Sequence, residues 1–132
     1  MPETGVPEPA QRLLRECVST FEQLGALLYL HDHKGKGSTV PALAKVLRIP
    51  AQSAREALDR LVSSGLVFQE STAPPAFTYR ASSPELEACV EALVRACVED
   101  RLGVLQLMGA FAIERTRAKL HKAFGGGFPP DR

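Results

Sequence analysis

The chain has 132 residues, the size of one domain, and its 45% hydrophobic and 23% charged residues are typical of a globular protein. The longest nearly apolar stretch, residues 102–113, is too short to cross a bilayer, which takes about 20 apolar residues. The first residues have neither the basic nor the apolar region of a signal peptide. We therefore expect a cytoplasmic protein that is not bound to a membrane.

The net charge of +1 conceals a segregation of charge along the chain. Residues 34–60 contain six Lys and Arg against two Asp and Glu, whereas residues 1–33 and 85–101 are acidic. A basic segment is a place where an anionic partner can bind. The segment 34–60 is therefore the best candidate for contact with such a partner.

The N-terminal third is predicted to be one long helix after an irregular start. Three prolines predict that residues 1–9 are extended or disordered, so order should begin near Ala10. Apolar residues then recur every three or four positions to about His31, which predicts one amphipathic helix. The polar sequence HDHKGKGS, with its two glycines, predicts a turn after this helix.

Two short helices are predicted after this turn. Ser38 or Thr39 can cap the first helix. Residues 48–50 end it, because a residue before proline avoids the α region. The second helix begins near Ala51, and Gly65 is placed to close it in a left-handed conformation.

A hairpin and a long helical region are predicted in the second half of the chain. The runs LVFQE and AFTYR, separated by STAPP, predict two strands with a loose tip. A helical pattern capped by Ser83 then continues to residue 124, interrupted at Asp100. We expect one long helix bent at Gly103 or Gly109, or two consecutive helices, followed by a flexible tail at 125–132.

The stretch STVPALAKVLRIPAQSAREALDRLVSSGLVFQE, with FTYR after it, resembles the winged helix-turn-helix of bacterial transcription regulators, particularly MarR-like ones. The likeness covers residues 38–80. The residues that carry it are Leu43, Ala44, Lys45, Ala54, Leu58, Leu61, Gly65, Leu66 and Val67.

The resemblance implies a mainly α (α+β) fold in a single domain over residues 10–124. Its core would be a winged helix-turn-helix with a two-stranded wing, flanked by long N- and C-terminal helices. The terminal helices of MarR-like regulators form a two-fold dimer. The terminal helices of this sequence contain more apolar residues than a single core needs, so we expect a homodimer.

The resemblance also implies that residues 51–64 form a recognition helix for the major groove of double-stranded DNA. Arg55 and Gln52 are the base-edge candidates, because Arg pairs with guanine and Gln with adenine through two hydrogen bonds. The predicted DNA-binding residues are Lys45, Arg48, Gln52, Ser53, Arg55, Arg60 and Arg80, with Lys34 and Lys36 as further backbone contacts.

The alternative is a winged helix that contacts another protein and does not bind nucleic acid. Two acidic residues, Glu56 and Asp59, lie on the presumed reading face, and the wing sequence STAPP contains no Lys or Arg.

No enzyme motif is present, since the chain contains no GxSxG, HExxH, P-loop or dinucleotide fingerprint, and we expect no enzyme. His31 and His33 flank an aspartate at a predicted helix end, where polar residues are common, so we expect neither a metal site nor a cofactor. The cysteines without a CxxC motif, predicted to be buried thiols, are Cys17, Cys89 and Cys97.

Overall fold

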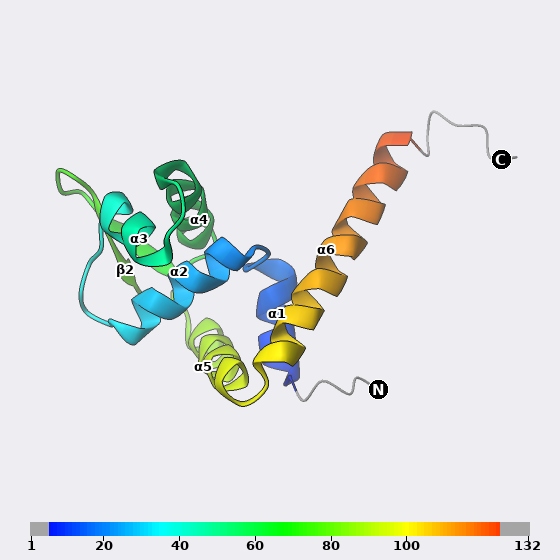
Figure 1. Cartoon of the computed structure of the whole chain (residues 1–132). Coiled ribbons are helices and arrows are strands. Elements are labelled where there is room, and N and C mark those ends of the chain that lie inside the picture. Colours follow the sequence, from blue (N-terminus) through cyan, green and yellow to red (C-terminus); the bar gives the residue numbers. More distant parts are fainter. Residues whose placement is uncertain (1–5, 125–132) are drawn as a thin grey trace, which may run out of the picture.

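The computed structural model describes residues 6–124, which form six helices and one two-stranded sheet. The elements in chain order are α1 (Glu8–Glu16), α2 (Phe21–Asp32), α3 (Val40–Leu47), α4 (Ala51–Ser63), β1 (Val67–Glu70), β2 (Ala76–Tyr79), α5 (Pro84–Glu99) and α6 (Arg101–Phe124). Figure 1 shows α2, α3, α4 and the hairpin together at one end, with α1 and α5 beside them and α6 extending away. None of the helices within 6–124 is long and apolar enough to span a membrane.

The prediction of one helix from Ala10 to His31 is wrong, because residues 17–20 separate α1 from α2. Thr20 Oγ1 accepts a hydrogen bond from the Gln23 backbone N–H at 3.0 Å, and Gln23 Oε1 accepts one from the Ser19 N–H at 2.7 Å. These bonds satisfy backbone donors at a helix start and so favour a new helix at this point.

Helix α1 begins at Glu8, slightly before the predicted start at Ala10. Pro7 is its N-cap and Pro9 lies in its first turn, where a proline loses nothing because the N–H there has no partner within the helix. The first five residues of the predicted disordered segment lie outside the described part of the chain.

The helix pair α3 and α4 confirms the predicted helix-turn-helix. Thr39 Oγ1 accepts a hydrogen bond from the Ala42 N–H at 3.3 Å and caps α3. Arg48 ends this helix with a positive φ of 59°, and Gly65 follows α4 with a φ of 80°. Glycine adopts this left-handed conformation freely, whereas in arginine the Cβ atom makes it costly.

The hairpin confirms the predicted wing. Its strands pair antiparallel, with Val67 opposite Tyr79 and Glu70 opposite Ala76. The fully buried Phe77 also exchanges two backbone hydrogen bonds with Ser38, of 2.8 and 2.9 Å, which tie the segment before α3 to β2.

The long helical region consists of two helices, α5 and α6, and the predicted bend at Gly103 or Gly109 is wrong. The break lies at Asp100, whose Oδ1 accepts a hydrogen bond from the Gly103 N–H at 3.0 Å. Both glycines are inside α6. An aspartate in this position caps a new helix as well as ending the old one. The predicted flexible tail, 125–132, lies outside the described residues.

One continuous core joins the two ends of the molecule. Leu27, Leu58 and Phe77 are fully buried in the winged-helix end, and Leu14 and Leu93 are fully buried where α1 packs against α5. The winged helix is therefore held by packing as well as by the chain segments that lead into and out of it.

Candidate nucleic-acid interface

The outer face of α4 carries four exposed polar side chains at helical spacing. Gln52, Arg55, Glu56 and Asp59 are exposed, and they lie three or four residues apart. The opposite face is buried in the core through Ala54, Ala57, Leu58 and Leu61. The structure therefore places both predicted base-reading residues, Gln52 and Arg55, on the exposed face of α4.

Each of these two residues pairs with an acidic neighbour one turn along α4. Gln52 Nε2 donates to Glu56 Oε2 at 3.2 Å, and Arg55 Nε lies 3.4 Å from Asp59 Oδ1. Exposed pairs of this spacing contribute about 0.3 to 0.5 kcal/mol each, whereas a bidentate contact to a base contributes about 1 to 3 kcal/mol. The intrahelical pairs therefore present only a small barrier to base contact.

Two predicted phosphate contacts, Lys45 and Arg48, lie at the end of α3. Both side chains are exposed, and neither has a hydrogen-bond or ion-pair partner within residues 6–124. The left-handed conformation of Arg48 places its cation in the turn that leads into α4. These two residues are free positive charges beside the outer face of α4.

Arg60 and Ser53 are not part of this outer face. Arg60 Nη2 donates to the Glu16 carbonyl oxygen at 2.8 Å, which links the C-terminal end of α4 to the end of α1. Ser53 is half-buried and lines a cavity of about 150 Å³ with Thr20 and Gln23 from the start of α2.

The other predicted contacts lie on the wing, in the loop before α3 and beside α5. The Arg80 guanidinium lies 5.1 Å from the centre of the exposed Phe68 ring, so both project from the hairpin. Lys36 is exposed in the loop before α3. Lys34 Nζ instead lies 3.2 Å from Glu91 Oε2 and is held against α5.

The residues around Lys34 were missed by sequence reasoning. Glu91 accepts from both His31 and Lys34, which lower the pKa of its carboxyl to about 2, the His31 hydrogen bond being the larger cause. Tyr79 donates to Glu87, and burial together with this hydrogen bond raises the pKa of the tyrosine. No local signal identifies the partners of Glu91, because they lie about sixty residues away in the sequence.

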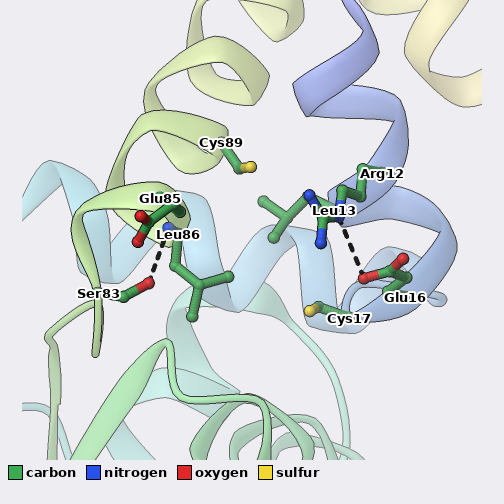
Figure 2. Close-up of a pocket in the computed structure, with 8 residues that line it drawn as sticks. All are labelled: Arg12, Leu13, Glu16, Cys17, Ser83, Glu85, Leu86 and Cys89. Carbon is green, nitrogen blue, oxygen red and sulfur yellow. Dashed lines mark hydrogen bonds and ion pairs between the residues drawn. The ribbon is translucent and has the colours of Figure 1, made fainter.

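A cavity of about 210 Å³ lies between α1 and the start of α5 (Figure 2). Cys17 and Cys89 both line it, and both are only partly buried, so the prediction of buried thiols is confirmed for Cys97 alone. Burial raises the pKa of the Cys17 and Cys97 thiols. Within residues 6–124, no three His, Cys, Asp or Glu side chains are grouped as metal ligands.

The paired helices, the hairpin after them and the helices on either side define a winged helix-turn-helix fold. The model of the MarR family matches residues 20–75. This match and the fold confirm the resemblance inferred from the sequence.

Several solved structures share the fold. One is MepR, a transcription regulator of the Staphylococcus aureus multidrug efflux pump MepA, at 23% identity and a TM-score of 0.52, covering 90% of this chain and 87% of MepR. A MepR mutant bound to an oligodeoxyribonucleotide gives 22% identity and a TM-score of 0.51 over 90% of this chain and 87% of that one. A MarR family protein from Bacillus stearothermophilus is 20% identical, with a TM-score of 0.51, and the match covers 88% of this chain and 82% of that protein. A search of curated proteins finds no match.

Proposed function

We propose that this protein is a DNA-binding transcription regulator of the MarR family that acts as a homodimer and is not an enzyme. The observation that carries the proposal is the exposed face of α4, with the two free cations Lys45 and Arg48 beside it, on a MarR-like frame. The similar MepR mutant was solved with an oligodeoxyribonucleotide bound, which supports the same partner for this chain. A regulator of this kind would act in the cytoplasm.

In this proposal α4 enters the major groove. Arg55 and Gln52 give up their contacts to Asp59 and Glu56 and bind base edges instead. Lys45, Arg48 and Arg80 contact phosphates. DNA contacts by Ser53 and Arg60 remain predictions from the sequence, and the positions of these two side chains add no support to them.

The far half of α6 supports the homodimer. It projects beyond the other elements (Figure 1), and between residues 112 and 122 every side chain except Arg115 is exposed. Ile113 and Leu120 are 59% and 52% exposed, and they line a shallow groove of about 330 Å³ along the helix. Apolar side chains at this spacing on a projecting helix are typical of a helix that packs against another chain.

A salt-dependent binding assay tests the DNA proposal. The wild-type chain should bind duplex DNA at low salt, with an affinity that falls linearly on a logarithmic scale as salt rises. The double variant Lys45→Ala with Arg48→Ala should bind more weakly, and the salt slope of its dimer should be smaller by about 3.6, because four phosphate contacts are lost and each removes about 0.9.

The matched control is Arg95→Ala with Arg101→Ala, which removes two exposed cations from α5 and the start of α6, away from the proposed DNA and dimer surfaces. Its salt slope should equal that of the wild type. The absence of duplex binding at low salt, or equal losses in the two double variants, would contradict the proposal.

The second candidate is a winged helix that binds another protein. Val46 on α3 and Phe68 on the wing are 50% and 46% exposed, and exposed apolar side chains favour a protein contact. This candidate gains support if the chain binds no duplex at low salt.

A further inference from the structure

Two carboxylates one turn apart on α5, Glu87 and Glu91, bind side chains from three segments of the winged helix. Glu91 Oε2 lies 2.8 Å from His31 Nε2 at the end of α2 and 3.2 Å from Lys34 Nζ in the next loop. Glu87 Oε1 accepts from the Tyr79 hydroxyl on β2 at 2.7 Å, and its Oε2 lies 3.7 Å from Lys34 Nζ. We call Glu87 and Glu91 the α5 carboxylate pair.

These contacts join two parts of the molecule whose helices make most of their backbone contacts within their own part. Helix α5 packs mainly against α1, and also against α6, whereas α2 packs against α3, α4 and β2. The bridge between the two groups at this point is made by long side chains. The His31 side chain is only 14% exposed, and its ring meets the edge of the Tyr79 ring at 5.1 Å.

A second polar link lies elsewhere between the same two parts, where Arg60 donates to the Glu16 carbonyl oxygen at 2.8 Å. The continuous core and the chain segments on either side of the winged helix already join the two parts, and polar links at two separate points further oppose a rotation of one part against the other. The α5 carboxylate pair supplies a polar link away from Arg60, in which Glu87 binds Tyr79 of the wing and Glu91 binds His31 at the end of α2.

We propose that Glu87 and Glu91 are positioning residues that fix the orientation of the winged helix, α2 to β2, relative to α5 and α6. The contacts are individually weak, because both carboxylates are nearly half exposed, but they share one rigid helix and oppose the same movement. The consequence for DNA rests on the proposed function: in a homodimer this orientation sets the distance between the two recognition helices.

Distance measurements between two spin labels test the orientation directly. The labels are placed on exposed alanines of α3 and α6, as Ala42→Cys and Ala110→Cys. The native cysteines are first replaced, by serine at 17 and 89 and by alanine at 97. Labelled chains are mixed with an excess of unlabelled chains, so that each measured distance lies within one chain even in a dimer.

The labelled protein should give one narrow distance distribution. The double variant Glu87→Gln with Glu91→Gln should lose it and give a broad one, while circular dichroism shows that both proteins remain folded. The matched control is Glu85→Gln with Glu99→Gln, which makes the same charge change on the same helix at two exposed carboxylates without a hydrogen-bond or ion-pair partner in the described part of the chain. The control should keep the narrow distribution.

A narrow, unshifted distribution in the Glu87 and Glu91 double variant would overturn the proposal, as would equal broadening in the control. No DNA is present in this measurement, so its result is independent of whether the protein binds DNA. Loss of DNA binding in Lys45 and Arg48 variants leaves the positioning role untouched, and unchanged distances leave the DNA proposal untouched.

Discussion

The projecting half of α6 makes the proposed dimer open to a quantitative test by substituting Ile113 and Leu120 with serine. Burying a whole Ile or Leu side chain contributes about 1.5 to 3 kcal/mol. Because the two side chains are 59% and 52% exposed, a partner can bury about half of each, which contributes about 1 kcal/mol per side chain. A two-fold dimer contains each residue twice, so the double substitution should weaken association by about 4 kcal/mol, or roughly a thousandfold in Kd.

Sedimentation velocity over a range of protein concentrations measures this change. The wild-type chain should sediment as a dimer at tens of micromolar, and the double variant should sediment as a monomer. The matched control is Val46→Ser with Phe68→Ser, which removes apolar side chains of similar exposure, 50% and 46%, from the winged helix. A monomeric wild type, or a double variant that associates as tightly as the control, would refute the reasoning.

Three further predictions concern single residues. Glu91→Gln should destabilise the protein by about 1 kcal/mol at neutral pH, a value kept small because the carboxylate is 45% exposed. The wild-type advantage, measured by urea unfolding at several pH values, should disappear as pH falls from 4.5 towards 2, because the folded state holds the pKa of Glu91 below its ordinary 4.5. Asp100→Ala should cost about 1 kcal/mol in the same assay, since the Gly103 N–H loses its acceptor; an unchanged urea midpoint would argue against a capping role. Arg48→Gly should stabilise the fold by about 0.5 to 1 kcal/mol by removing left-handed strain, yet weaken duplex binding by removing a cation. A loss of stability in Arg48→Gly would show that the arginine side chain makes contacts that offset the strain.

Local signals in the sequence predicted most of the winged helix. Thr39 and Ser83 cap α3 and α5 through hydrogen bonds to N–H groups three residues later, so the residues that fix each helix start are neighbours in the sequence. Gly65 closes α4 for the same reason, because its freedom at positive φ is a property of one residue. These features depend little on the rest of the fold.

The missed break at residues 17–20 also had a local signal, which the apolar periodicity concealed, whereas the break at Asp100 was one of the two predicted alternatives. Thr20 and Gln23 form a capping pair, and Asp100 caps the N–H of Gly103. The apolar stripe passes through both breaks because residues on either side of each break pack into the same continuous core. Periodicity reports which residues are buried, and it does not report whether the backbone between them is one helix.

The α5 carboxylate pair could not have been predicted from the sequence, for a different reason. Glutamates one turn apart on a helix are typical of a solvated face, and the partners of Glu91 are about sixty residues away. For the same reason the sequence suggests Lys34 as a DNA contact, although its ammonium group forms ion pairs with Glu87 and Glu91. The residue types near the reading helix could be identified from the sequence, but which cations remain free depends on the packing of distant segments.

The acidic neighbours on α4 affect specificity more than affinity in the proposed function. Breaking the pair between Arg55 and Asp59 costs about 0.3 to 0.5 kcal/mol, which a contact of Arg55 to guanine exceeds. Phosphate contacts by Lys45 and Arg48 are made without breaking any pair in the described part of the chain, so sequence-independent binding should not be penalised by the acidic residues. The freed Asp59 carboxylate must then face the groove, where it can accept a hydrogen bond from a cytosine amino group but gains nothing from an acceptor atom. The free-energy penalty therefore falls on DNA sequences that present no hydrogen-bond donor to Asp59. It lowers the affinity for those sequences and not the affinity for DNA in general.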